Sequence, residues 1–199
     1  MNIIFDLGGV VFTWEPMLML ANIFPDPVSS EKIKSDLLNH YDWSELDKGT
    51  LSCEEAIKRA NERTGIPLLK IRELFDEVPK RLTPKQDTLN LIRELRRKKH
   101  KIYVLSNMFS EVADYLENEY SFWDLFDGIV FSARIKLIKP SPEIFHYILN
   151  RFNLIPEETV FLDDMQENVD AAVREGINGI LFKSADQAKK ELRNLEFRI

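Results

Sequence analysis

Short apolar runs punctuate the chain at residues 3–5, 102–105, 128–131, 159–162 and 179–182. Each run is bounded by glycine or polar residues, a pattern typical of strands buried on both faces. From about residue 84 onward, segments with helical spacing alternate with these runs, and capping signals such as Ser141-Pro142 and Ser184 to Gln187 open two of them. Alternating strands and helices predict a Rossmann-like parallel sheet with helices on both faces.

Residues 14–83 show helical spacing and no convincing strand. Apolar residues fill positions 16–24, and Ser30 is placed to cap a helix through about Asn39. A capping box at Ser52 opens a helix that ends at Gly65, and another begins at Pro67 and continues to about Val78. We therefore expect an α/β core of residues 1–13 and 84–199, with a small helical-bundle cap of residues 14–83 inserted after the first strand.

Composition narrows the class of protein. The 199 residues carry a net charge of -6, which argues against a nucleic-acid partner. The basic run at residues 96–100 is best explained as a solvated helix end. The single cysteine, Cys53, rules out an internal disulfide and a cysteine-based zinc cluster. With no apolar run near 18 residues and a core strand at the start, we expect no membrane partner and a cytoplasmic location; the oligomeric state stays open.

Polar side chains follow the predicted strands at the point where each strand ends. Asp6 follows the first, Ser106 and Asn107 follow another, and Asp163-Asp164 follow a third. Lys139 lies in a connection after a further strand. Each residue alone has an ordinary explanation as a cap, a turn or a surface lysine. Because ligands bind beyond the carboxyl ends of parallel strands, their joint occurrence there predicts one polar crevice.

This set of groups suits phosphoryl transfer through an aspartyl intermediate. A carboxylate can attack phosphorus to form an acyl phosphate, which water then hydrolyses. The attack brings two anions together, and a hard cation, a lysine and neutral donors would offset the repulsion. Magnesium, which prefers oxygen ligands, fits the supply of carboxylates.

The same residues resemble the motifs of the haloacid dehalogenase (HAD) superfamily over essentially the full chain. The first motif corresponds to residues 5–10 (FDLGGV), and the second to residues 105–107 (LSN). The third corresponds to residues 139–145 (KPSPEIF), and the fourth to residues 161–164 (FLDD) with residues 168–172. The resemblance is closest to the branch that contains the bacterial alpha-D-glucose-1-phosphatase. It implies that the helical insert is the cap of this family.

The resemblance also implies roles for individual residues. Asp6 would be the nucleophile and a magnesium ligand, together with the main-chain carbonyl of Gly8 and the carboxylate of Asp164. Ser106, the main chain of Asn107, and Lys139 would hold the phosphate. Asp163, acting mostly through a metal-bound water, and Asn168 would support the site from behind these ligands.

Two positions depart from the family pattern. Most phosphatases of the superfamily have a second aspartate, which protonates the leaving group, where this chain has Gly8. We therefore expect turnover to rise steeply as the pKa of the leaving group falls, with sugar 1-phosphates favoured over 6-phosphates. A cap residue such as Asp42 or Glu45, or a metal-bound water, is an alternative source of the proton. The second departure is the segment before Lys139, residues 134–138, where relatives often have a glycine.

Three functions follow from this sequence. The first is a magnesium-dependent phosphomonoesterase that acts on a small phosphorylated metabolite, such as a sugar 1-phosphate. The second is carbon–halogen hydrolysis through an alkyl ester of Asp6, which requires no magnesium and gives no reason for the Asp163-Asp164 pair. The third is a non-catalytic binding protein on the same scaffold, against which the joint presence of Asp6, Ser106, Lys139 and Asp164 argues.

Overall fold

A computed structural model describes residues 1–26 and 32–196 of the chain. Its centre is a parallel five-stranded sheet in the order β3-β2-β1-β4-β5. The strands are β1 (Asn2–Phe5), β2 (Lys101–Ser106), β3 (Gly128–Phe131), β4 (Thr159–Asp163) and β5 (Asn178–Leu181). All five predicted strands are confirmed to within two residues, and the α/β Rossmann-like fold is confirmed with them.

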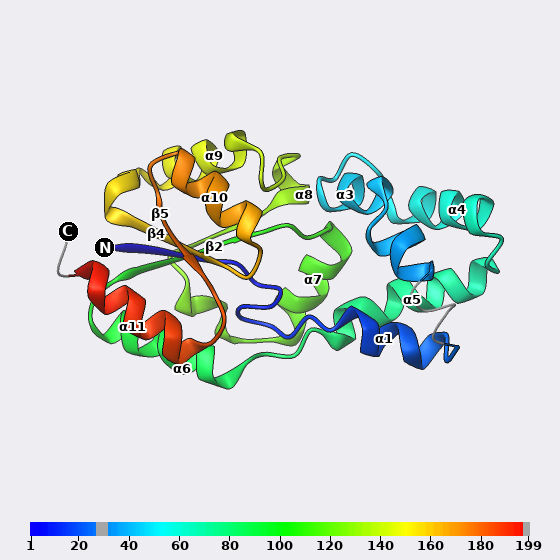
Figure 1. Cartoon of the computed structure of the whole chain (residues 1–199), viewed down its shortest axis with the longest axis horizontal. Helices are drawn as coiled ribbons and strands as arrows, with labels where there is room; N and C mark the ends of the chain where they lie inside the picture. The colour runs from blue at the N-terminus through cyan, green and yellow to red at the C-terminus, as the bar shows by residue number, and fades with distance from the viewer. Residues whose placement is uncertain (27–31, 197–199) are drawn as a thin grey trace.

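Helices cover both faces of the sheet, as Figure 1 shows. Alternate residues of β1 point in opposite directions, so Ile3 and Phe5 join one buried cluster and Ile4 joins another. The first cluster includes residues of α6 (Gln86–Arg97), α7 (Ser110–Glu119) and α11 (Ala185–Glu196), and the second includes residues of α9 (Pro142–Phe152) and α10 (Gln166–Arg174). Burial on both faces explains why the strands are continuous apolar runs.

The order of the strands defines where a ligand site can form. The chain runs outward from β1 to β2 and β3, and then returns to β4 and β5 on the other side of β1. The direction of winding reverses between β1 and β4, and the carboxyl ends of such strands border a crevice. Asp6 directly follows β1, and Asp163-Asp164 lie at the end of β4. The three carboxylates therefore meet at the switch point of the sheet.

The helices of the inserted segment lie together beyond this end of the sheet, to the right in Figure 1. They are α1 (Pro16–Ile23), the π-helix η1 (Lys34–Leu38), α3 (Tyr41–Asp47), α4 (Cys53–Thr64) and α5 (Leu68–Arg81). We refer to this group as the cap. The predicted helix from Ser30 to Asn39 is described only in its second part, where it includes the π-turn, and Ser30 lies outside the described residues.

The capping predictions have mixed outcomes. Ser52 accepts a hydrogen bond from the Glu55 N–H at 3.3 Å, and Gly65 has the expected left-handed conformation with φ 72°. Ser141 occupies the N-cap position of α9, with Pro142 first in the helix, but its side chain makes no capping bond. Helix α3 was missed. It begins because the Nδ1 atom of His40 accepts a hydrogen bond from the Asp42 N–H at 3.1 Å.

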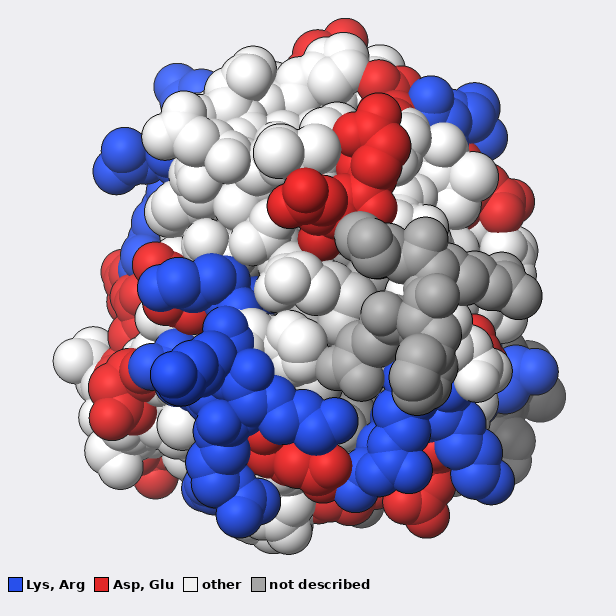
Figure 2. All heavy atoms as spheres, turned by 90° about the vertical axis from the view of Figure 1, so that its left-hand side faces the viewer, with Lys and Arg blue, Asp and Glu red and all other residues white. Residues whose placement is uncertain are grey.

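The end of the molecule opposite the cap is rich in Lys and Arg, interspersed with Asp and Glu, as Figure 2 shows. Arg96 and Lys101 pair with Asp127 at 3.2 and 2.9 Å. These ion pairs are consistent with the basic run as a solvated helix end. Across the ranges that the structure describes, no helix combines the length and apolar character required to cross a bilayer.

Candidate active site

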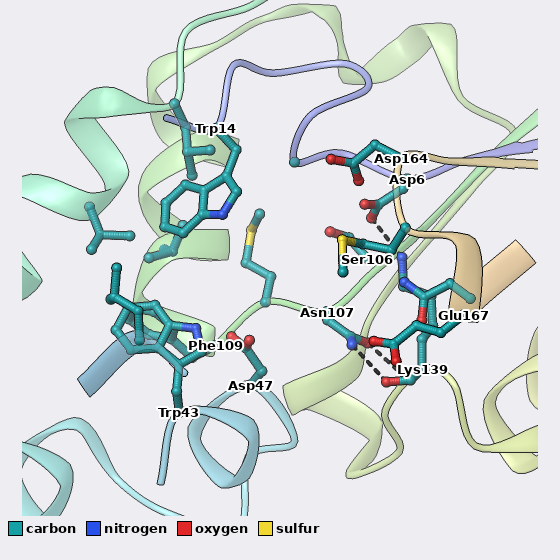
Figure 3. A pocket seen from close by; sticks show the side chains of 18 residues that line it. Asp6, Trp14, Trp43, Asp47, Ser106, Asn107, Phe109, Lys139, Asp164 and Glu167 are labelled. Carbon is teal, nitrogen blue, oxygen red and sulfur yellow. Dashed lines mark hydrogen bonds and ion pairs between the residues drawn. The ribbon is translucent and has the colours of Figure 1, made fainter. Parts of the chain in front are cut away.

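A cavity of about 340 Å³ lies between the carboxyl ends of the strands and the cap. Residues from both parts line it, as Figure 3 shows. Those that the sequence placed in one crevice and that line the cavity are Asp6, Gly8, Ser106, Asn107, Lys139, Asp164 and Asn168. Asp163, also predicted, is fully buried behind them. The structure thus brings together all the core residues that the sequence singled out for the site.

Lys139 is the central charged residue on the core side of the cavity. Its Nζ atom lies 2.8 Å from Oδ1 of Asp6 and 2.6 Å from Oδ2 of Asp163, and the residue is only 3% exposed. Burial alone lowers the pKa of this ammonium, but the charges of Asp6 and Asp163 outweigh it and raise the pKa above its ordinary value. Lys139 therefore stays charged beside the nucleophile candidate.

Asn107 fixes the backbone at Lys139. Its Nδ2 donates to the Lys139 carbonyl, and its Oδ1 accepts from the Lys139 N–H, both at 2.9 Å. This pair of hydrogen bonds joins the segment after β2 to the loop that carries the lysine. The side chain of Asn107 is thus used within the protein, which is compatible with a phosphate contact through its main chain.

Asp163 holds the lysine from behind. Besides the ion pair with Lys139, its oxygens accept from the Met165 N–H at 2.8 Å and from Nδ2 of Asn168 at 3.1 Å. Its acceptor sites are therefore engaged by protein groups. Such a carboxylate orients Lys139 rather than binding a ligand directly.

Asp6 is a buried carboxylate with an oxygen that can accept a further partner. Burial is the largest cause that raises its pKa, to about 7, and Asp163 and Asp164 add to it while Lys139 opposes it. Although Lys139 lies 2.8 Å away, Oδ1 of Asp6 is the one buried side-chain oxygen or nitrogen in the described part of the chain that has no well-oriented hydrogen bond. A buried polar atom in this state requires another partner.

The donor set fits a divalent cation as that partner. An oxygen of Asp6 and an oxygen of Asp164, the two available carboxylates, lie within 4.8 Å of each other, and an oxygen of Asp163, whose acceptor sites are already engaged, lies within the same distance of both. The pKa of Asp164 is also raised, chiefly by burial and then by the charge of Asp163. A cation at this point would favour the ionised carboxylates, and oxygen ligands of this kind suit magnesium.

Gly9 shapes the position of Asp164. Its φ of +73° is in the left-handed region, and a Cβ atom there would lie 2.1 Å from Oδ2 of Asp164. In the structure the carboxylate of Asp164 packs against this turn, so the glycine makes room for a candidate metal ligand.

The cap side of the cavity is predominantly apolar. Trp43 of α3 packs against Phe75 and Phe109, with ring centroids 5.6 and 5.7 Å away, and is half-buried. Trp43 is therefore part of the apolar packing and also lines the cavity. The other apolar lining residues from the cap segment are Trp14, Leu38, Val78 and Leu82, and the core adds Met108, Phe109, Val112 and Met165.

Asp47, at the end of α3, is a lining residue that the sequence analysis missed. Burial is the main cause that raises its pKa, to about 7; the Phe109 N–H and the side chain of Trp43 act in the opposite direction. Trp43 and Asp47 are four residues apart and so share a helix face. Recognising α3 as a helix with Trp43 toward the site would have identified Asp47.

The two cap carboxylates that the sequence named do not line the cavity. Asp42 lies 2.7 Å from Arg63 and 3.5 Å from Arg59. Burial raises its pKa, but the bond to Arg63 outweighs this, and the net shift is downward. Glu45 accepts from the Thr50 hydroxyl, which lowers its pKa. Both are ionised groups that stabilise the cap.

Comparison with known proteins agrees with this geometry. The family model for haloacid dehalogenase-like hydrolases matches residues 1–176. A sesquiterpene phosphatase of Aspergillus oryzae is 30% identical, with 96% of this chain and 94% of that protein aligned. A D-ribitol-5-phosphate phosphatase of Bacteroides thetaiotaomicron is 28% identical, with 84% of each chain aligned.

Among solved structures, a HAD family enzyme from Bacteroides thetaiotaomicron in complex with magnesium and inorganic phosphate has a similar fold. The TM-score is 0.74 at 23% identity, covering 92% of this chain and 94% of that one. The glucose-1-phosphatase branch named from the sequence stays a prediction. The motifs, the switch-point site and the family match together establish that this chain is an enzyme of the haloacid dehalogenase-like hydrolase family.

Proposed function

We propose that the protein is a magnesium-dependent phosphomonoesterase that works through an aspartyl-phosphate intermediate on Asp6. The observation that carries this proposal is the ion-paired triad of Asp6, Lys139 and Asp163 beside the carboxylate of Asp164. A buried lysine next to a nucleophilic carboxylate offsets the repulsion between that carboxylate and a phosphate. Two relatives reported above are themselves named phosphatases, which supports this choice.

Each residue of the site has a distinct role in the proposed reaction. Asp6, the Gly8 carbonyl and Asp164 would hold the magnesium ion, which when bound neutralises charge on the phosphate. Ser106, the Asn107 main chain and Lys139 would bind the phosphate oxygens. Asp163 and Asn168 orient the lysine. Asp6 then forms the bond to phosphorus.

A halide-displacing hydrolase is the competing enzyme class. That reaction would use Asp6 as well, but it gives no role to the carboxylate of Asp164. The carboxylate of Asp164 packs on Gly9, and one of its oxygens lies within 4.8 Å of an oxygen of Asp6. This arrangement favours the phosphatase. A non-catalytic binding role would leave the joint presence of Asp6, Lys139, Ser106 and Asp164 around one cavity without a reason.

The cap wall bears on the organic part of the substrate. The sequence argument favoured a sugar 1-phosphate, but the cap contributes Trp, Leu and Val side chains and the single carboxyl group of Asp47 to the cavity lining. Sugar hydroxyls against such a wall would lose hydrogen bonds to water without replacement. We therefore favour a phosphate ester with an apolar or aromatic organic group, small enough for about 340 Å³. The name of the sesquiterpene phosphatase relative is consistent with this preference.

A substrate panel tests the proposal. The purified protein would be assayed on 4-nitrophenyl, benzyl and geranyl phosphates, glucose 1- and 6-phosphates, and 2-chloropropionate, each with magnesium or excess chelator. We expect phosphate release that depends on magnesium and is fastest with the apolar esters. Chloride release that persists in chelator would favour the dehalogenase, and a preference for glucose 1-phosphate would restore the sugar assignment.

A further inference from the structure

The phosphomonoesterase proposed above requires a proton for the departing oxygen, and the first motif supplies no side chain for this because it has Gly8. The carboxyl-bearing residues that line the cavity, among those described, are Asp6, Asp47, Asp164 and Glu167. Asp6 is the proposed nucleophile and Asp164 a proposed metal ligand. Glu167 is exposed in the first turn of α10, where water solvates its carboxylate. Asp47 is the remaining group.

Asp47 faces the reaction centre from the cap. Figure 3 shows its side chain on the opposite side of the cavity from Asp6 and Asp164, beside Trp43. A phosphate held at Asp6, Ser106 and Lys139 would direct its ester oxygen away from the nucleophile, because attack and departure are roughly in line. The departing oxygen of a bound ester thus points toward the cap side of the cavity.

Asp47 is held firmly by contacts with the core. Its main-chain carbonyl accepts a hydrogen bond from the Ser132 hydroxyl, which also accepts from the Met108 N–H at 2.8 Å. Two residues later, Gly49 has φ +74°, and a Cβ atom there would lie 2.3 Å from the Ala133 carbonyl oxygen. The loop after α3 therefore packs closely on α8 (Ser132–Ile135), which fixes the end of the helix that carries Asp47.

We propose that Asp47 is the general acid that protonates the leaving oxygen of the phosphate ester. As an oxygen of Asp6 bonds to phosphorus, the bond from phosphorus to the ester oxygen breaks. That oxygen takes the proton from Asp47 and departs as the alcohol. In the second half, the Asp47 carboxylate removes a proton from water, whose oxygen attacks phosphorus and displaces Asp6. Phosphate leaves, and Asp47 is again protonated.

The surroundings of Asp47 keep its carboxyl group protonated near neutral pH. Burial raises its pKa to about 7, and the negative charge of Asp6 adds to the rise, while Lys139 opposes it. The arginines on the helices packed against α3 are engaged elsewhere: Arg59 and Arg63 with Asp42, and Arg134 with Asp114 and Glu117. A general acid works best with a pKa near the working pH.

The role of Asp47 changes one expectation from the sequence. Without a proton donor, turnover would rise steeply as the leaving group becomes less basic. With Asp47 in place, the wild-type enzyme has a shallow dependence, and the steep dependence appears only when the acid is removed. The effect of a substitution thus depends on the leaving group, which a purely structural role for Asp47 would not produce.

The test compares Asp47→Asn with the wild type on 4-nitrophenyl phosphate, whose leaving group is weakly basic, and benzyl phosphate, whose leaving group is a strongly basic alkoxide. The asparagine keeps the shape and the acceptor oxygen. We expect kcat/KM, which covers only the steps up to departure of the leaving group, to fall by about 10²–10⁴-fold on benzyl phosphate and by less than about tenfold on 4-nitrophenyl phosphate. Hydrolysis of the shared intermediate affects kcat on both esters alike. The alkaline decline of wild-type activity on benzyl phosphate should be absent in the variant. Asp47→Glu, which keeps a carboxyl group, should recover part of the loss.

Two control variants separate the possible outcomes. Glu45→Gln, on the same helix but away from the cavity, should retain both activities, and Glu167→Gln should lose no more on benzyl phosphate than on 4-nitrophenyl phosphate. Equal losses of kcat/KM on the two esters in Asp47→Asn, or a selective loss of kcat/KM on benzyl phosphate in Glu167→Gln, would overturn the role of Asp47 alone. A wild type that hydrolyses neither ester with magnesium would instead overturn the phosphatase function on which this role rests.

Discussion

The core wall and the cap wall of the cavity are built from different kinds of contact. On the core wall, Lys139 forms short ion pairs with Asp6 and Asp163, which directly follow or end strands β1 and β4. The cap wall is largely apolar and contributes one carboxyl group, that of Asp47. On the proposed mechanism, the core would fix the reaction at phosphorus, while the cap would determine which ester enters and how its oxygen departs.

Replacing the nucleophile should have the largest effect. Asp6→Asn keeps the shape of the side chain but removes the anion that attacks phosphorus. We expect kcat to fall by at least about 10³-fold on every ester, because loss of covalent catalysis does not depend on the leaving group. This uniform loss contrasts with the selective loss expected for Asp47→Asn. Near-normal turnover by the purified variant would remove Asp6 from the mechanism.

Removing the central lysine of the core wall should lower the free energy of unfolding far more than removing an exposed lysine. Lys139→Met leaves Asp6 and Asp163 buried without their cation, and breaking such a pair costs about 3–5 kcal/mol of unfolding free energy. The matched control is Lys101→Met, which removes an exposed lysine paired with Asp127 and should cost at most about 1 kcal/mol. Denaturant unfolding measures both. Similar values for the two variants would contradict a central role for the buried network.

Alanine substitutions at two glycines test whether the position of Asp164 matters for magnesium binding. Gly9 and Gly65 have nearly the same backbone, with φ of +73° and +72°, but only at Gly9 would a Cβ atom collide with Asp164. Each alanine should cost about 1 kcal/mol of backbone strain. Gly9→Ala should also weaken magnesium binding by at least about tenfold, measured by calorimetry. Equal magnesium affinity in the two variants would show that the position of Asp164 is unimportant for the metal.

The smallest effect concerns the pH dependence of stability. The folded protein raises the pKa of Asp47 from 3.8 to about 7, so its proton stabilises the fold at low pH, and this contribution is lost as the pH rises through 7. Asp47→Asn should therefore be more stable than the wild type above pH 7, and similar to it below about pH 4. We expect about 1–2 kcal/mol, less than the full pKa difference implies, because the residue is partly exposed.

Asp42 is a matched carboxylate whose replacement should change stability in the opposite direction. Arg63 holds the pKa of Asp42 below its ordinary value, so Asp42→Asn should destabilise the protein at pH 7. The two curves, taken by thermal unfolding across pH, distinguish a carboxyl group kept protonated from one held as an ion. A destabilised Asp47→Asn at pH 8 would contradict the raised pKa of Asp47.

The same contrast explains what could be predicted from the sequence. Apolar runs in the sequence are followed by Asp6, Ser106 and Asp164. Because the carboxyl ends of parallel strands lie at one edge of a sheet, the sequence pattern was enough to predict that these side chains lie close together. Asp47 has no such signal. Its environment depends on how α3 docks on α8 through Ser132 and Gly49, contacts separated by about 85 residues in the chain. Asp42 and Glu45 were named instead. The pairing of Asp42 with Arg63 is equally a tertiary property, whereas the Thr50 hydroxyl that bonds to Glu45 lies only five residues further along the chain.

Trapping the covalent intermediate tests the central claim most directly. The enzyme would be mixed with 4-nitrophenyl phosphate and magnesium, quenched during turnover, and treated with borohydride, which reduces an aspartyl phosphate to homoserine. Peptide mass spectrometry then locates the change. We predict homoserine at position 6 in the wild type, and none in Asp6→Asn or in enzyme quenched without substrate. Turnover with an unmodified Asp6, or with the reduced residue at Asp47 or Asp164, would contradict the mechanism.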